Sequence, residues 1–196
     1  MSNMLQYLDQ LLFAVLPYVA LFLFFYVTIY RYKAQKFTYS SLSSQFLENQ
    51  NHFWGLVPFH YGILVVLTGH FVAFLIPRKI LMFNSVPVRL YVLEVSALIF
   101  GLLTLIGLIA MVVRRMTHPK IKIVTTPSDW VVLAILLLQV VSGVSVAVFH
   151  PWGSSWFASA MSPYLMSIVK LSPEISYVIA LPWLVKLHIL NAFLLI

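Results

Sequence analysis

The chain has 196 residues, of which 62% are hydrophobic and 9% are charged, whereas an average soluble domain carries about 25% charged residues. This composition excludes a soluble enzyme, a disordered tail and a collagen-like fibre, and it leaves an integral membrane protein. The net charge of +7 does not indicate nucleic-acid binding, because the basic residues sit in short clusters at the ends of apolar runs.

The apolar residues form long unbroken runs, which are typical of membrane helices and not of an alternating barrel. A spanning helix needs about 20 apolar residues, so a chain of 196 residues has room for about five spans and no separate water-soluble domain. We therefore predict an all-α integral membrane fold with five transmembrane helices, built as a single domain over residues 1–196.

The first predicted span runs from Leu11 to Tyr30, and three basic residues follow it directly: Arg31, Lys33 and Lys36. The positive-inside rule places this basic end in the cytoplasm and the N-terminus outside. Residues 37–52 are polar with a half-apolar pattern, which predicts a short interfacial helix. The second span runs from Phe53 to Ile76.

A loop is expected from Pro77 to Arg89, followed by a third span from about Leu90 to Val113. The next loop should be cytoplasmic, because it carries a second basic cluster: Arg114, Arg115, Lys120 and Lys122. The fourth span runs from Trp130 to Phe149, with Ser128 or Asp129 as its N-cap. Residues 151–181 then form an external segment.

The last span begins near Pro182 and runs to Ile196, about 15 residues, which is short for a hydrocarbon core that needs about 20. We therefore expect the natural chain to continue beyond Ile196.

Three of the six histidines lie inside predicted spans: His60, His70 and His188. An ionisable side chain within the membrane is costly, and it indicates a functional site by default. The plain structural alternative is a neutral histidine that hydrogen-bonds across helices. The other three, His52, His118 and His150, fall in loops or at helix ends, where a histidine needs no special explanation.

The depths of these histidines favour a haem. His70 lies roughly 10 Å and His188 roughly 9 Å from the outer edge, on antiparallel spans, so the two imidazoles can ligate one iron from opposite sides. His60 lies roughly 15 Å further along its helix, with room for a second haem. Its partner is expected beyond Ile196.

The sequence has no cysteine, which excludes thiolate-bound iron–sulfur clusters, c-type haem attachment and cysteine-bound zinc. The haem must therefore be b-type. Gly62 and Gly69 flank the histidines and serve either helix packing, which we favour, or the approach of a flat macrocycle. Glu94 is either a proton relay or, as we prefer, a surface carboxylate that snorkels to the interface.

With these residues the chain resembles the γ subunit, the cytochrome b membrane anchor, of respiratory nitrate reductase. The specific part of the resemblance is Phe59-His60 and Gly69-His70 with Leu187-His188 on the last span. Further matches extend over nearly the whole chain: Arg31-Tyr32, Ser43-Ser44-Gln45, Arg114-Arg115, Pro119, Thr125-Thr126, Asp129, Gln139 and Gly143.

The resemblance implies two b haems in a four-helix bundle of spans two to five, one on His70 and His188 and one on His60 with a later histidine. It implies that Arg115 contacts a haem propionate, for which a guanidinium is a natural partner. It also implies quinol oxidation near Gly69 and His70. In the family a lysine in the loop after span two is implicated in quinol binding. In this chain the corresponding position is at or near Tyr91, and Arg89 lies within one turn of it.

The mechanism implied by the resemblance separates charge across a bacterial or archaeal cell membrane. Quinol loses two electrons and releases two protons outside, and the electrons pass through the haems to an iron–sulfur subunit and a molybdenum subunit in the cytoplasm. Three alternatives remain open: an anchor of a related molybdenum complex such as nitrite oxidoreductase, a haem-free anchor in which the histidines bridge helices, and a small transporter, which is disfavoured for lack of broken helix pairs.

Overall fold

The structure is a computed structural model that describes residues 2–34 and 50–196. Within these ranges the chain is helical and contains no strand. The elements are α1 (Ser2–Gln10), η1 (Leu11–Val15, a π-helix), α2 (Leu16–Ala34), α3 (Gln50–Leu75), α4 (Pro77–Asn84), α5 (Pro87–Thr117), α6 (Pro119–Val124), α7 (Pro127–Phe149), α8 (Gly153–Trp156), η3 (Phe157–Met161, a π-helix), α9 (Ser162–Val169), α10 (Ser176–Ile179) and α11 (Trp183–Leu194).

In the described part of the chain, four helices are long and apolar enough to cross a membrane: Gln6–Ala34, Phe53–Leu75, Pro87–Thr117 and Pro127–Phe149. They correspond to the first four predicted spans. The predicted fifth span corresponds to α11, an apolar helix of 12 residues. The predicted interfacial helix lies outside the described residues up to position 49.

Prolines decide where several of these helices begin. Pro77, Pro87, Pro119 and Pro127 each occupy the first turn of a helix, where the missing N–H costs nothing. The loop predicted from Pro77 to Arg89 was therefore wrong, because Pro77 starts α4 and Pro87 starts α5.

The start of α7 also differs from the expected cap. Thr126 is the N-cap, and its hydroxyl accepts a hydrogen bond from the Asp129 backbone N–H while the Asp129 carboxylate accepts one from the Thr126 N–H. This reciprocal capping box satisfies two backbone donors that would otherwise be unpaired. Ser128 is not the cap, and Asp129 is the partner of the cap.

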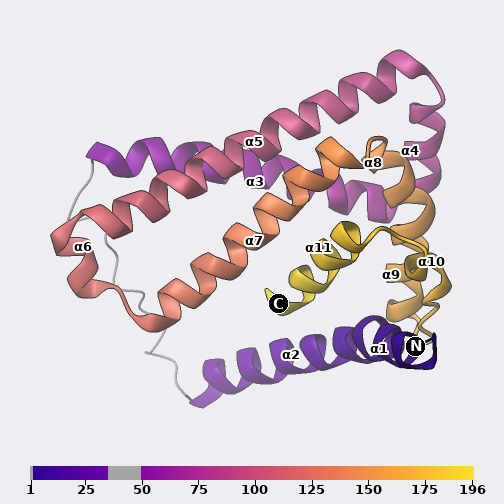
Figure 1. The fold of residues 1–196 in the computed structure, drawn as a ribbon, viewed down its shortest axis with the longest axis horizontal. Coiled ribbons are helices and arrows are strands. Elements are labelled where there is room, and N and C mark those ends of the chain that lie inside the picture. Colours follow the sequence, from indigo (N-terminus) through magenta and orange to yellow (C-terminus); the bar gives the residue numbers. More distant parts are fainter. Residues whose placement is uncertain (1, 35–49) are drawn as a thin grey trace.

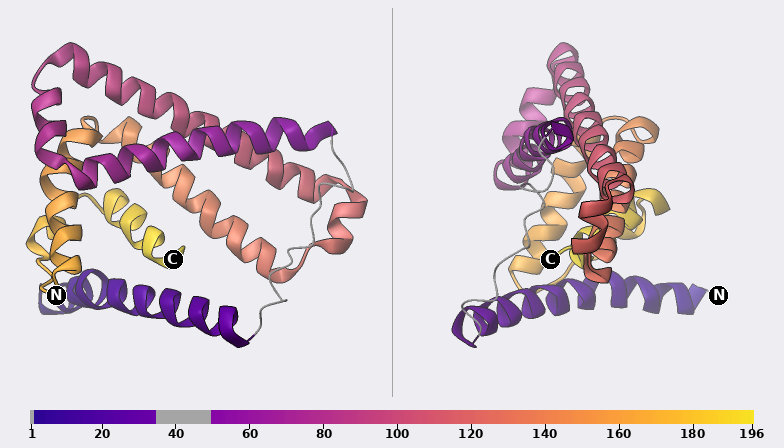
Figure 2. Two further views of the ribbon diagram at one scale, coloured as in Figure 1. Left: turned by 180° about the vertical axis from the view of Figure 1, so that it is seen from behind. Right: turned by 90° about the vertical axis from the view of Figure 1, so that its left-hand side faces the viewer.

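The helices divide the molecule into two ends (Figure 1). The N-terminus, α4 and the short helices α8 to α10 gather at one end, while α6 lies at the other, toward which the last turn of α2 and the first turns of α3 and α7 also point. The view from behind shows the same division (Figure 2). Both basic clusters predicted to be cytoplasmic therefore fall at the α6 end, apart from Lys36, which is not described.

The long helices pack in sequence, α3 along α5, α5 on α7, α7 on α11, and α11 on α2. The α3–α5 contact is the closest, and glycines make it possible. A Cβ on Gly62 would lie 2.4 Å from Thr104 Oγ1, and a Cβ on Gly107 would lie 2.4 Å from the backbone nitrogen of Phe59. Lipid tails provide no hydrophobic drive for helix association, so such close backbone contact is a main source of stability.

A buried cluster joins the N-terminal helix to α9 and α11. Phe13, Tyr164, Ile168, Val185 and Ile189 are core members. The fully buried Tyr164 hydroxyl donates a hydrogen bond of 2.7 Å to the Phe13 carbonyl oxygen. Burial, with a smaller effect from Tyr18, raises the pKa of Tyr164, so its hydroxyl remains a donor.

We predict that Gly62→Ala destabilises the protein by roughly 1–3 kcal/mol, because the new methyl group would overlap Thr104 and the α5 backbone. The thermal unfolding midpoint of the detergent-solubilised protein measures this. Gly101→Ala is the matched control, since its Cβ would meet Val144 at an ordinary 3.5 Å. Equal midpoints for the two variants would contradict the close α3–α5 packing.

We also predict that Tyr164→Phe costs roughly 1–3 kcal/mol, because it leaves the Phe13 carbonyl without its buried donor. Limited proteolysis of the N-terminal helix should accelerate in parallel. Tyr61→Phe, at a side chain that is 67% exposed, should change neither measurement. Unchanged proteolysis in Tyr164→Phe would show that this bond does not hold the N-terminal helix.

Candidate functional site

The two histidines of α3 are held in the same way. His60 Nδ1 lies 2.8 Å from the Leu56 carbonyl oxygen, and His70 Nδ1 lies 2.8 Å from the Val66 carbonyl oxygen, each one helical turn earlier. A carbonyl can only accept, so each Nδ1 must carry the hydrogen. Each Nε2 therefore has a free lone pair, which is the form of imidazole that ligates a metal.

Both rings lie exposed on α3, and each has an aromatic neighbour. Phe59 contacts His60 edge to face with ring centres 5.2 Å apart, and Phe157 contacts His70 in the same manner at 5.1 Å. Phe157 opens the π-helix η3, a geometry that is frequent at functional sites. The short helices after α7 therefore contribute to the surroundings of His70.

His188 lies on α11 and faces α7. Its Nδ1 is 3.0 Å from Ser142 Oγ, and its Nε2 is 3.4 Å from Gln139 Nε2. That His188 shares one iron with His70 stays a prediction.

The glycines beside the histidines have different roles. Gly62 packs against α5, as expected for a packing residue. A Cβ on Gly69 would meet no atom within 4 Å. The packing interpretation is therefore wrong for Gly69, where open space adjoins His70.

Arg115, predicted to meet a haem propionate, lies at the α6 end. Its Nη1 donates to Thr125 Oγ1 at 3.2 Å and lies 3.4 Å from Asp129 Oδ2. Asp129 is also the capping partner of Thr126. In this structure Arg115 therefore links the end of α5 to the start of α7, and its predicted contact with a propionate stays a prediction.

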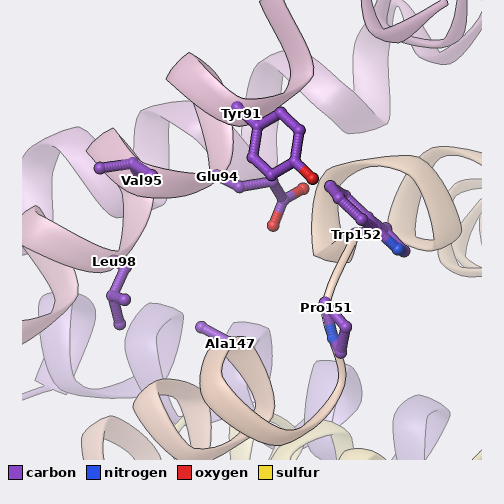
Figure 3. A pocket seen from close by; sticks show the side chains of 7 residues that line it. All are labelled: Tyr91, Glu94, Val95, Leu98, Ala147, Pro151 and Trp152. Carbon is purple, nitrogen blue, oxygen red and sulfur yellow. The ribbon is translucent and has the colours of Figure 1, made fainter. Parts of the chain in front are cut away.

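The other residues of the predicted quinol site lie near the start of α5. Arg89 lies over the Phe83 ring, 5.7 Å from its centre. Tyr91 contacts Trp152 edge to face and lines a cavity of about 150 Å³ with Glu94, Val95, Leu98, Ala147, Pro151 and Trp152 (Figure 3). Neither Gly69, His70 nor Arg89 lines this cavity, so the four predicted residues do not share it.

Glu94 in this cavity has a structural role that the sequence interpretation missed. Its carboxylate accepts hydrogen bonds from the backbone N–H groups of Gly153 and Ser154 at 3.1 and 2.8 Å, and from the Ser154 hydroxyl at 2.6 Å. It satisfies backbone donors at the start of α8. The interpretation of Glu94 as a snorkelling surface carboxylate was wrong.

The remaining histidines lie at helix ends. His118 links α5 to α6, and His150 follows the last residue of α7. His52 falls in the first turn of α3, and its side chain is not described.

The donor set around His70 and His188 fits a haem iron held by two imidazoles, because Nδ1 of each ring has a hydrogen-bond partner in the protein and Nε2 is the nitrogen left to bind a metal. Within residues 2–34 and 50–196, no group of three or more His, Cys, Asp or Glu side chains gathers as a metal site.

The sequence interpretation gave no role to the polar groups of α7 and α11 around His188, although Gln139 was among the residues of the resemblance. Asn191 Nδ2 donates to the Gln139 side-chain oxygen at 2.8 Å and to the Ile135 carbonyl at 3.0 Å. Gln139, Ser142 and Gly143 are spaced three and four residues apart on one helix face. That spacing, in an otherwise apolar span opposite a histidine, is the signal that could have identified them.

Comparison with known proteins identifies the family of the chain. The family model of the nitrate reductase gamma subunit matches residues 9–196. The nitrate reductase gamma chain of Bacillus subtilis (strain 168) is 28% identical over 94% of this chain and 84% of its own length. The respiratory nitrate reductase 2 gamma chain of Escherichia coli (strain K12) is 32% identical over 77% of this chain and 69% of its own. The chain belongs to the nitrate reductase gamma subunit family.

Proposed function

We propose that this chain is the quinol-oxidising cytochrome b subunit of a respiratory nitrate reductase. The observation that carries the proposal is the hydrogen bond at Nδ1 that two histidines within the long apolar helices have in common. His60 and His70 each donate from Nδ1 to a backbone carbonyl of their own helix, so each offers an unprotonated Nε2. In membrane helices, where an unused imidazole is costly, this arrangement supports metal ligation.

In this proposal His70 and His188 hold the outer, distal haem b through their Nε2 atoms. His60 is the ligand that this chain offers to the proximal haem b. When bound, such a haem accepts and gives up single electrons. The residues of this chain orient the ligands, exclude water and set the polarity around the iron.

The haem-free alternative requires the histidines to bridge helices. The described hydrogen bonds of His60 and His70 stay within α3, which argues against that role for both. His188 does bond across to α7. That bond leaves its Nε2 lone pair available, so bridging and ligation are compatible at this residue.

Topology supports the direction of electron flow. The basic clusters lie at the α6 end, which the positive-inside rule assigns to the cytoplasm of a bacterial or archaeal cell. The N-terminus and α8 to α10 then lie outside, and α11 belongs to the predicted fifth span. The iron–sulfur and molybdenum subunits of the complex dock at the α6 end.

Quinol oxidation belongs at the opposite end, beside Gly69 and His70, with Arg89 and Tyr91 close to the membrane surface. A quinol that binds there gives up two electrons and releases its two protons outside. The electrons leave toward the cytoplasmic end, so charge separates across the membrane because electrons cross and protons do not.

We predict that His70→Ala and His188→Ala each abolish the same haem b signal, because each removes one axial ligand of one iron. Pyridine haemochrome and reduced-minus-oxidised spectra of the purified protein measure this. His150→Ala, at the end of α7, should retain the wild-type haem content. A wild-type protein without haem b, or a His70→Ala variant with full content, would overturn the proposal.

We further predict that Gly69→Leu lowers quinol-dependent nitrate reduction by about 100-fold, because its side chain would fill the space beside His70 and displace the quinol. Haem content and the unfolding midpoint should change little, since no packed neighbour lies there. Nitrate reduction from an artificial donor to the soluble subunits should stay at the wild-type level. Equal loss with both donors would place the defect outside the quinol site.

A further inference from the structure

We propose that Ser142 on α7 is the positioning residue of the distal haem, because its hydroxyl sets the orientation and the electron-donor strength of His188. This inference rests on the proposed haem ligation by His70 and His188. The Ser142 hydroxyl does not contact the iron itself. The inference therefore predicts a change in the midpoint potential of the distal haem and none in the proximal haem.

The hydrogen bonds around His188 define its tautomer at Nδ1. Ser142 Oγ lies 3.1 Å from the Gln139 carbonyl oxygen and can donate its hydroxyl hydrogen to it. In that arrangement the oxygen of Ser142 accepts from His188 Nδ1, 3.0 Å away, and Nδ1 carries the hydrogen.

The other ring nitrogen gives the same assignment independently. The side-chain oxygen of Gln139 accepts from Asn191 Nδ2 at 2.8 Å, so the amide nitrogen of Gln139 faces His188 Nε2 at 3.4 Å. An amide nitrogen only donates, so Nε2 must hold a lone pair. The iron would take the place of this long hydrogen bond.

His188 differs from the two histidines of α3 in what holds it. His60 and His70 donate to backbone carbonyls, which no substitution can remove. His188 depends on a side chain of another helix, and Ser142 is only 2% exposed, so water cannot readily replace it. Gly143 fixes the other face, since a Cβ there would lie 2.8 Å from His188 Cε1.

The bond has an electronic consequence. A hydrogen bond donated from Nδ1 makes imidazole a more basic ligand, which favours ferric over ferrous iron. Loss of the Ser142 hydroxyl should therefore raise the midpoint potential of the distal haem. It should also free the ring to rotate about its iron bond, which changes the low-spin ferric electron paramagnetic resonance signal.

The test compares Ser142→Ala with Ser145→Ala in the full chain assembled with its partner subunits. Ser145 is on the same helix, and its hydroxyl donates to the Val141 carbonyl at 2.7 Å. In Ser142→Ala we expect a positive shift of the distal midpoint potential and a moved g-value. Haem transfer to apomyoglobin from that site should be about 10- to 100-fold faster. Ser145→Ala should match the wild type.

The haem that disappears in His70→Ala identifies the distal signal. A wild-type protein with no such haem would overturn the proposed function itself. A distal haem whose potential, g-values and transfer rate are unchanged in Ser142→Ala would overturn the role of Ser142 alone. Equal shifts in Ser145→Ala, or in a haem that survives His70→Ala, would also overturn it. Selective loss of the distal haem in Ser142→Ala would support it.

Discussion

The close approach of α3 and α5 determines where the histidines of the site can lie. Gly62 and Gly107 let the two backbones meet with no room for a Cβ, and in lipid such contact replaces the hydrophobic drive that soluble helices have. Because α3 carries both His60 and His70, its fixed position relative to α5 and α7 fixes both imidazoles. The remaining helices build on this pair, with α7 on α5 and α11 on α7.

Several polar groups inside this apolar framework find partners within the protein, where lipid would offer none. The Nδ1 atoms of His60 and His70 use carbonyl oxygens of their own helix. Asn191, 2% exposed, donates to Ile135 and Gln139, and Glu94 accepts from the start of α8. Since the Nδ1 atoms of the histidines are satisfied from within the protein, the free Nε2 atoms are the groups left for chemistry.

Much of the fold could be predicted from the sequence, because the bilayer imposes length and hydropathy on every span. The first four spans are confirmed for that reason. The helix from Pro77 to Asn84 was missed, because its polar and apolar residues lack a long run and its start depends on the position of a proline. The fifth span stays a prediction, since α11 has 12 residues.

The candidate site was only partly predictable. His60, His70 and His188 stand out because ionisable residues are rare within spans. Contacts between residues far apart in the chain produce no such recognisable pattern in the sequence. Glu94 meets Ser154, 60 positions away, and Ser142 meets His188, 46 positions away. A lone serine or glutamate in a helix looks like a surface residue until the fold supplies its partner.

The proposed distal iron would thus have two ligands that are held by different means. His70 is fixed by its own helix, so its position follows α3 and the packing of α3 on α5. His188 is fixed by the side chain of Ser142, so its position follows the contact of α11 with α7. A change in the α7–α11 contact would therefore move one proposed ligand, His188, and leave His70 in place. The polar face of α7 is therefore where sequence variation can adjust the distal haem without altering the helix that carries both His60 and His70.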